Sequence, residues 1–565
     1  MPRGALISLI SSSLCFYFTT NDFTVVGRLT KNLSLWRGGQ GRSPHKNNDY
    51  NRRMAGKEIV IDGTRLTIPD VAAVAHENSN VTVAPEAVER MNRSRKVIES
   101  ILESNLTVYG VNTGFGKLSE IRILPNQLNE LQLNLVRSHA AGVGEAFPVP
   151  VTRAIMLLRA NTLARGNSGV RPKVVQLLLD MLNKQVHPVI PSRGSVGASG
   201  DLAPLAHLAL VLIGEGVAMS GSMILPGRQA LSDKGLNPVV LQAKEGLALI
   251  NGTQAMTGMG ALAWLDALRL AKLAEVAGAA SLDVTRGTDT AFDPRIAEVR
   301  PHPGAGIVAR NLRDLISGSG IRESHRGSPH KVQDHYSLRC MPQVHGAVRD
   351  VLAMAKQSIE IELNSSTDNP LVFVETGDLI SGGNFHGAPM SLCLDFLGIA
   401  LCQIASISER RVALLIDSTQ SELPPFLTRD SGLNSGFMIA QVTAASLVSE
   451  NKVLAHPASA DTIPTSANKE DHVSMGVTAA LKLQQIAQNT AYVLAIELLC
   501  AAQALDLLAP QKTSPPLQAA YELIRGYVPM MEKDRILSED IASVLRLSSQ
   551  ASFLARIESA LGHPL

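Results

Sequence analysis

Three small residues, Ala198, Ser199 and Gly200, carry the most suggestive chemistry in this 565-residue chain. Gly200 has no side chain, so its backbone nitrogen can approach the carbonyl carbon of Ala198 with little hindrance. If this ring closes and two waters leave, one of them carrying the Ser199 hydroxyl oxygen, the backbone becomes a methylidene-imidazolone. Such a ring is an electrophile, which ordinary side chains do not supply and which enzymes usually obtain from a metal or a bound cofactor.

The same tripeptide has an ordinary interpretation as the start of a helix. Ser199 is a favourable N-cap residue, and Asp201 suits the first turn of the apolar run that follows. In that case Gly194, Gly197 and Gly200 only make the preceding loop flexible. The chemical interpretation therefore requires that other parts of the chain build a site around Ser199.

Five further segments combine polar or aromatic residues with small ones. Tyr109 lies in YGVNTGFGKL, and a tyrosine that acts as a base needs its pKa, ordinarily about 10, lowered by positive charge or hydrogen bonds. His139 lies in RSHAAGVGE and Asn251 in LINGTQAMTG, where a structural histidine and a helix N-cap are the ordinary alternatives. The other segments are VQDHYSLRCMPQVHG with Gln333, Tyr336 and Arg339, SGGNFHGAP with Phe385, and PTSANKEDHVSMG with Glu470. An arginine such as Arg339 can bind a carboxylate through two parallel hydrogen bonds.

Several common kinds of site are excluded. The sequence has no P-loop or H-E-x-x-H motif, and Gly200 directly after Ser199 does not fit a G-x-S-x-G nucleophile elbow. The 14 histidines lack the tight spacing with cysteines or carboxylates that a metal site requires, so we expect no metal. The five cysteines are scattered and form no C-x-x-C pair, which favours a reducing compartment over a disulfide framework.

The composition is that of a globular protein without a strong charge. Hydrophobic residues make up 45% and charged residues 18%, which argues against disorder. A net charge of +2 gives no general attraction to nucleic acids or acidic membranes. We therefore expect no nucleic-acid or membrane partner.

Residues 1–53 differ in charge from the rest of the chain. They contain eight Lys or Arg and two Asp, whereas the remainder contains 44 basic and 48 acidic residues. Met54 then opens an ordinary globular sequence, so we favour an extension outside the mature fold, translated from an upstream start codon. A secretory signal and a transit peptide are the alternatives. The apolar run of this extension is too short and too serine-rich to span a membrane.

Hydrophobic periodicity predicts a mainly α protein with two domains. The N-terminal domain, residues 54–250, is a smaller mixed α/β part, and residues 251–565 form a long central helical bundle. Helices are expected at 85–104, 126–138, 150–165 and 171–184, from about 254 onward, at 387–412 and at 473–508. Strands are expected at 58–61 with 65–68, as a hairpin, and at 371–381.

Taken together, these segments resemble the aromatic amino-acid ammonia-lyases, in particular the members that act on histidine. The similarity extends from Met54 to Leu565, and GSVGASGDLAPLAH is highly specific to this family. The resemblance implies that Ala198, Ser199 and Gly200 form the methylidene-imidazolone (MIO), so no external cofactor is needed. It also implies a helical homotetramer with active sites shared between subunits and a small-molecule substrate, and we expect a cytoplasmic location.

The resemblance assigns a role to each candidate side chain. Tyr109 would be the base or proton shuttle near the substrate β-carbon, and Glu470 would contact the imidazole or act as a base. His139 would bind the imidazole, since the pair Ser138-His139 looks like the histidine-specific version. Arg339 would hold the substrate carboxylate. The remaining residues, which would surround the electrophile and position the substrate, are Asn251, Gln333, Tyr336 (also counted as catalytic) and Phe385.

The implied reaction eliminates ammonia from L-histidine to give trans-urocanate, the first step of histidine degradation. The substrate amine would add to the ring, which accepts the C–N electrons; attack by the substrate imidazole is the alternative. Lys469 departs from the glutamine usual in the family, and its charge would lower the pKa of Glu470 or weaken imidazolium binding. Other possible functions are a tyrosine or phenylalanine ammonia-lyase, an aminomutase, or a helical assembly protein without activity.

Overall fold

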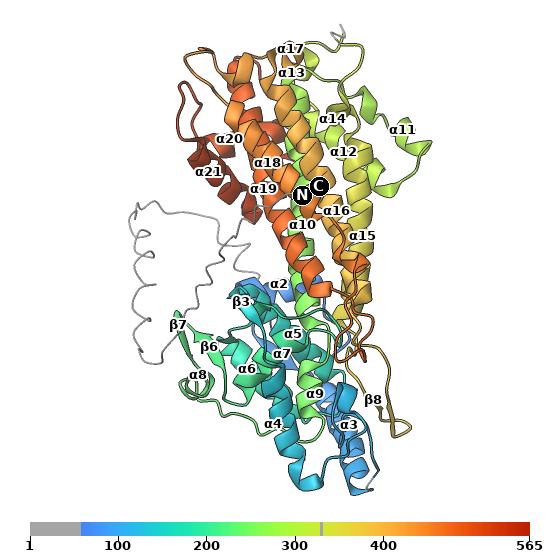
Figure 1. The fold of residues 1–565 in the computed structure, drawn as a ribbon. Helices are drawn as coiled ribbons and strands as arrows, with labels where there is room; N and C mark the ends of the chain where they lie inside the picture. The colour runs from blue at the N-terminus through green and yellow to red at the C-terminus, as the bar shows by residue number, and fades with distance from the viewer. Residues whose placement is uncertain (1–57, 105, 328–330) are drawn as a thin grey trace, which may run out of the picture. The chain divides into compact units, whose positions relative to one another are not determined.

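The computed structural model describes residues 58–104, 106–327 and 331–565. The predicted extension, residues 1–53, lies outside the described residues. The described part is mainly helical, as predicted, with its longest helices after residue 253 (Figure 1). The predicted division at residues 250/251 stays a prediction, although the first long helix begins close to it.

Short helices dominate the N-terminal part and match the predicted ranges. They are α3 (Pro85–Glu103), α4 (Leu128–His139), α5 (Val149–Ala164) and α6 (Pro172–Asn183). A proline lies in the first turn of α3, α5 and α6, where its missing N–H costs nothing. The other helices of this part are α2 (Ile68–Glu77), α7 (Leu202–Leu212), α8 (Gly227–Ser232) and α9 (Glu245–Ile250).

The predicted hairpin between residues 58–61 and 65–68 is wrong. β1 (Ile59–Ile61) pairs in parallel with β2 (Val81–Val83) instead. Residues 65–68 lead into α2, because Thr67 and Asp70 form a reciprocal capping box and Pro69 occupies the first turn. Helix capping therefore prevails over the short apolar alternation in this segment.

The remaining strands form small separate sheets. β3 (Val143–Ala146) pairs antiparallel with β5 (Pro191–Arg193). In a separate three-stranded sheet, β6 (Val217–Ser220) lies between β4 (Val186–Pro188) and β7 (Met223–Pro226) and is antiparallel to both. The strand signal at 371–381 is a two-stranded antiparallel hairpin of β8 (Leu371–Phe373) and β9 (Asp378–Ile380).

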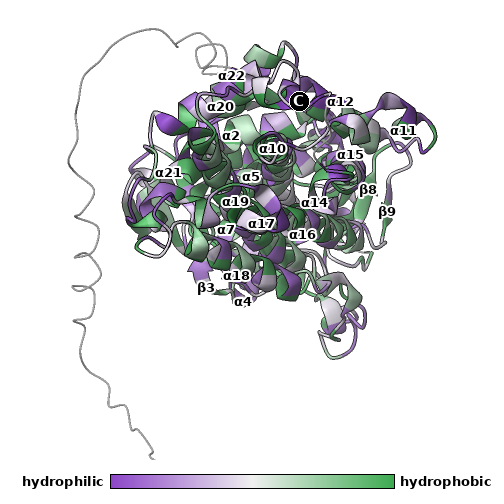
Figure 2. Ribbon diagram, turned by 90° about the horizontal axis from the view of Figure 1, so that it is seen from above, coloured by the Kyte–Doolittle hydropathy of each residue, from purple (hydrophilic) through white to green (hydrophobic). Residues whose placement is uncertain are grey.

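Three long helices form the centre of the bundle: α10 (Gln254–Val284), α16 (Ala388–Ile416) and α19 (Gly476–Leu507). Their sequences are apolar on most sides, and α10 is accordingly surrounded by α5, α12, α15, α16 and α19 (Figure 2). The other α-helices that follow α10 in the described part of the chain are α11 (Pro294–Glu298), α12 (Pro303–Ile316), α13 (Gly320–Glu323), α14 (Tyr336–Arg339), α15 (Met341–Leu363), α17 (Ser418–Ser421), α18 (Met438–Leu454), α20 (Pro515–Arg525), α21 (Leu537–Ser549) and α22 (Ala551–Leu561).

Two of these helices, α16 and α19, are long and apolar enough to cross a membrane. Of their most apolar stretches, 67% and 83% respectively are buried inside the protein. Such burial is typical of the core helices of a helical bundle, where neighbouring helices rather than lipid cover the apolar faces.

The three long helices begin at the same end of the bundle. Met256, in the first turn of α10, is so close to Gly387 and Gly476 that a Cβ at either glycine would collide with its sulfur. Gly387 precedes α16 and Gly476 begins α19. α15 runs in the opposite direction along α10, as the contacts of Trp264 with Leu352 and of Gly278 with Met341 show. The residues just before three helix N-termini therefore lie close together.

Candidate active site

A cavity of about 920 Å³ lies at the end where α10, α16 and α19 begin. Most predicted site residues line it, although they come from six separate segments. They are Tyr109, His139, Ala198, Ser199, Asn251, Phe385 and Glu470. Lys469 lines it too, with an exposed side chain. Gly200 follows directly after Ser199, so the tripeptide lies at the wall of this cavity.

The Ala198–Gly200 backbone is pressed against the residues that precede α10. Gly200 has a left-handed φ of 75°, and a Cβ at this position would collide with the carbonyl of Gly252. The amide of Asp201 donates to the same carbonyl at 2.6 Å. Only glycine fits here, and the close approach suits a backbone ring that involves the Gly200 nitrogen.

The alternative in which Ser199 only caps a helix is wrong. The N-cap residue of α7 is Asp201, and its side chain makes no capping bond to α7. Asp201 Oδ2 instead accepts the amides of Ala255 and Met256, at 2.8 and 2.9 Å, in the first turn of α10. Burial raises the pKa of Asp201 to about 7, although these hydrogen bonds act in the opposite direction. Asp201 thus ties the Ser199 loop to α10.

Asn251 is held by a buried ion pair. Its Nδ2 donates to Asp368 Oδ1 at 3.3 Å and to the carbonyl of Asn369 at 3.2 Å. Lys244 Nζ lies 2.8 Å from Asp368 Oδ2, and both side chains are completely buried. Asn251 Oδ1 is buried at the cavity with no hydrogen-bond partner. Since buried acceptors are normally paired, this oxygen is available to a ligand donor.

His139 is oriented by its own helix. It is the last residue of α4, and its Nδ1 donates to the carbonyl of Leu135 at 2.9 Å. A neutral imidazole carries one proton, so Nε2 remains an acceptor. An acceptor in this cavity suits an N–H donor such as the ring of a second imidazole.

Tyr109 does not have the lowered pKa that a base requires. Burial raises the pKa of Tyr109, and the charges of Glu470 and Asp368 raise it further, while a hydrogen bond from the amide of Gly116 opposes them. Within one chain the phenol therefore keeps its proton near neutral pH. A base at this position requires an additional cation.

Gln333, Tyr336 and Arg339 do not reach this cavity. Arg339 lies just before α15 and Asp368 just after it, so the length of the 23-residue helix separates them by about 35 Å (Figure 1). Tyr336 is 71% exposed, and the Arg339 guanidinium lies 4.6 Å from the centroid of its ring. The Nε of Arg339 is buried and has no partner.

A second buried ion pair supports α14. Arg411 donates to both carboxylate oxygens of Glu497, at 2.5 and 2.8 Å, and both side chains are completely buried. Ser281 and Ser408 also donate to Glu497, at 2.7 and 2.6 Å. Arg411 Nη1 donates to the carbonyl of Ser337 in α14, at 3.4 Å. The position of the helix that carries Tyr336 and Arg339 is therefore linked to the bundle core.

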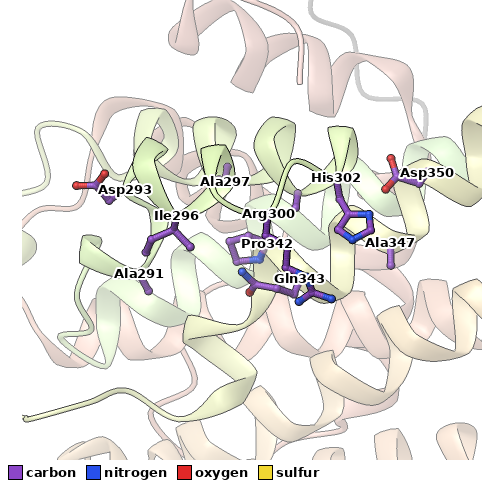
Figure 3. Close-up of a pocket in the computed structure, with 12 residues that line it drawn as sticks. Ala291, Asp293, Ile296, Ala297, Arg300, His302, Pro342, Gln343, Ala347 and Asp350 are labelled. Carbon is purple, nitrogen blue, oxygen red and sulfur yellow. The ribbon is translucent and has the colours of Figure 1, made fainter.

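A separate cavity of about 170 Å³ lies between α11, α12 and α15 (Figure 3). Its lining combines apolar side chains, mostly alanines, with five polar or charged ones: Asp293, Arg300, His302, Gln343 and Asp350. It contains none of the predicted catalytic residues. Within residues 58–104, 106–327 and 331–565, no group of three or more His, Cys, Asp or Glu is arranged to hold a metal ion.

The sequence did not identify Lys244 or Asp368 as residues that support the site. Asp368 lies in STDNP, whose composition indicates only a turn, and Lys244 lies in LQAKE, which contains no recognisable motif. Both charges are buried through tertiary contacts between distant segments. A fully buried lysine needs a carboxylate partner, but the sequence alone does not show that Lys244 is buried.

The chain is similar over most of its length to proteins of known families. The sequence profile of the aromatic amino acid lyase family matches residues 66–526. Histidine ammonia-lyase from Stigmatella aurantiaca is 54% identical over 507 residues, 90% of this chain and 99% of that protein. The crystal structure of histidine ammonia-lyase from Trypanosoma cruzi has a TM-score of 0.83 at 43% identity, covering 89% of this chain and 96% of its own. Tyrosine aminomutase from Streptomyces globisporus has a TM-score of 0.85 at 40% identity, covering 89% and 99%. This chain belongs to the aromatic amino acid lyase family.

Proposed function

We propose that this chain is the subunit of an ammonia-lyase that converts L-histidine to trans-urocanate and ammonia. The observation that carries the proposal is the cavity in which Ser199, His139 and Glu470 meet. His139 offers an acceptor to the substrate imidazole, and Glu470 offers a carboxylate. The high identity to histidine ammonia-lyases over nearly the whole chain supports the same reaction.

The residues at the cavity wall fit the MIO expected from Ala198, Ser199 and Gly200. Gly200 occupies a position that no side chain can share, and Asn251 Oδ1 is a buried acceptor without a partner beside it. When formed, the ring supplies an electrophile that withdraws electrons as the substrate C–N bond breaks. The remaining work falls to side chains: His139 orients the imidazole, Phe385 packs beside it, and Asn251 accepts a hydrogen bond.

We also propose a homotetramer in which a second copy completes each cavity. Gln333, Tyr336 and Arg339 lie at the opposite end of the bundle and are partly or fully exposed. Large exposed apolar side chains on α15 and α16, including Met354, Leu392 and Phe396, support association between copies. Arg339 from a second copy would bind the substrate carboxylate, and its charge would lower the pKa of Tyr109 toward that of a base. Cys340, Cys393, Cys402 and Cys500 are free thiols, which supports a cytoplasmic location.

Incubation of the purified enzyme with L-histidine tests the proposed reaction. We expect the ultraviolet absorbance of urocanate to appear, with ammonia released in equal amount. L-Tyrosine and L-phenylalanine are tested in parallel under the same conditions. Turnover of either one without L-histidine turnover would contradict the proposal. A β-amino acid product would indicate an aminomutase instead.

A further inference from the structure

Before any ring forms, the Ser199 hydroxyl is hydrogen bonded to a carboxylate from a distant part of the chain. Ser199 Oγ donates to Glu470 Oε1 at 2.9 Å. This oxygen is the atom that must leave if Ser199 is dehydrated. Glu470 is therefore placed at the leaving group of ring formation, in addition to the substrate cavity.

The other carboxylate oxygen of Glu470 is fixed by its own loop. Thr465 Oγ1 and Ser466 Oγ donate to Oε2 at 2.7 and 2.8 Å. The amide of Thr465 also donates to the Glu470 carbonyl, at 2.9 Å, which closes the loop. Oε1 is thereby left to Ser199, and the carboxylate has little freedom to turn away.

The loop that holds Glu470 is strained. Ser466, Ala467 and Asn468 have consecutive positive φ angles of 50°, 52° and 64°. Residues with side chains rarely adopt this region, and such strain persists where the surrounding structure determines it, often at functional sites. The strained turn is a second, independent indication that the fold holds the Glu470 side chain in one fixed position.

Dehydration of a serine needs help at the hydroxyl, because hydroxide is a poor leaving group. The Glu470 carboxylate, which accepts from the Ser199 hydroxyl, can take up a proton from solvent and pass it to Oγ as the Cβ–Oγ bond breaks, so that water departs. The electron pair of the Cα–H bond forms the Cα=Cβ double bond, and the Cα proton passes to solvent water. Glu470 is left as the carboxylate with which the step began, and the proton taken from solvent is balanced by the Cα proton returned to it, so atoms and charge balance.

We propose that Glu470 is the acid that dehydrates Ser199 during formation of the ring, in addition to its role toward substrate. The inference rests on the proposed function only in requiring that the ring forms. It concerns the maturation of the chain, and its result is a covalent change that mass spectrometry detects without any measurement of turnover.

Intact mass and peptide mapping of the segment around Ser199 test this role. Wild-type chains should be lighter than the translated sequence by two waters. Glu470→Gln keeps the size of the side chain and can accept the Ser199 hydrogen bond, but it has no acidic proton to donate. We expect it to retain the Ser199 oxygen, so that its chains are heavier than mature wild type by one or two waters.

The neighbouring residue supplies a matched control. Asp471 is exposed and also lines the cavity, so Asp471→Asn makes the same carboxylate-to-amide change one residue away and should lose both waters. Complete loss of both waters from Glu470→Gln would overturn the inference. If that variant does not fold, Glu470→Asp keeps the acid but withdraws it by one methylene: a partly unmodified population supports the role, and full modification contradicts it.

The two proposals fail in different ways. A wild-type chain that keeps its full translated mass would contradict the ring, and with it the proposed function. A wild-type chain and a Glu470→Gln chain that are equally modified would contradict only the maturation role of Glu470. Urocanate formation by wild type would then still stand.

Discussion

The two ends of the helical bundle hold different halves of the predicted site. At one end, six segments enclose a cavity around Ser199, Asn251 and Glu470. At the other, the four-residue helix α14 presents Tyr336 at the surface, with Arg339 beside it. Arg339, the residue that the family resemblance assigns to the substrate carboxylate, thus lies at the end of the bundle away from Ser199, which is consistent with the proposed site shared between copies.

Both halves are supported by a completely buried ion pair, but the pairs act on different parts of the site. Asp368 of the Lys244–Asp368 pair accepts from the side chain of Asn251, which lines the cavity. Arg411 of the second pair reaches only a backbone carbonyl of α14. The first pair therefore sets the orientation of a functional amide, and the second sets the position of a whole helix.

The largest effect is expected from Ser199→Ala at the enclosed end. Without the hydroxyl no double bond forms, so the electrophile is lost, and activity on L-histidine should fall by at least about 10³-fold. Far-ultraviolet circular dichroism and the oligomer mass should match wild type. Wild-type turnover in a folded Ser199→Ala enzyme would contradict the electrophile.

Subunit mixing tests whether the two halves come from different copies. Arg339→Ala should lower kcat/KM by about 10- to 100-fold, because charge-assisted hydrogen bonds to a carboxylate contribute about 1.5–3 kcal/mol. When Arg339→Ala and Ser199→Ala chains are unfolded together and refolded, some cavities combine the intact Ser199 of one chain with the intact Arg339 of the other. Activity above that of either variant refolded alone is expected. No gain in verified mixed oligomers would contradict a shared site.

The sequence was informative about the enclosed half and about the long helices, for physical reasons. Helices such as α10 and α19 are apolar over many turns, and this periodicity does not depend on distant contacts. The failed hairpin at 58–61 with 65–68 shows the limit, since the capping box of Thr67 and Asp70 determines that segment. The site residues were assigned by family resemblance, because periodicity gives no information about which loops meet.

The groups that orient those residues could not be predicted. Lys244 and Asp368 are 124 residues apart, and only the folded chain buries them together at 2.8 Å. The spatial separation of Arg339 from Ser199 was also not visible in the sequence. It follows from the direction of α15, which carries the chain from one end of the bundle to the other.

Variants of the two buried ion pairs should differ in their steady-state kinetics. Asp368→Asn leaves the Lys244 ammonium buried without its counter-charge, and Glu497→Gln does the same to Arg411, so each should lower the free energy of unfolding by about 3–5 kcal/mol. Because Asp368 orients Asn251 at the reacting groups, its variant should lower kcat. Glu497→Gln shifts α14 and should raise KM, as measured in folded enzyme. The same kinetic change in both variants would remove the distinction between the two ends.

The smallest expected effect concerns acid stability. In this respect the N-terminal part and the bundle resemble each other, because each contains a buried histidine beside an arginine. Arg153 Nη1 donates to His187 Nε2 at 2.9 Å, so the imidazole must be neutral, and burial together with the Arg153 charge lowers the pKa of His187 to about 4. In the bundle, burial and the charges of Arg411 and Arg349 lower the pKa of His345 well below its usual value.

An unfolded histidine titrates near pH 6.5, so between about pH 6.5 and 4 the unfolded chain binds a proton that native His187 does not. The stability contributed by neutral His187 is therefore complete above about pH 6.5 and is lost as the pH falls toward 4. His187→Gln keeps an acceptor for Arg153 but has no titrating group, so its free energy of unfolding should fall less steeply over this range in denaturant titrations. His345→Gln should flatten the same limb. If the slope of the unfolding free energy against pH is unchanged in one of the two variants, the histidine of that region does not limit acid stability. The two regions would then differ in acid stability, although each contains a completely buried ion pair.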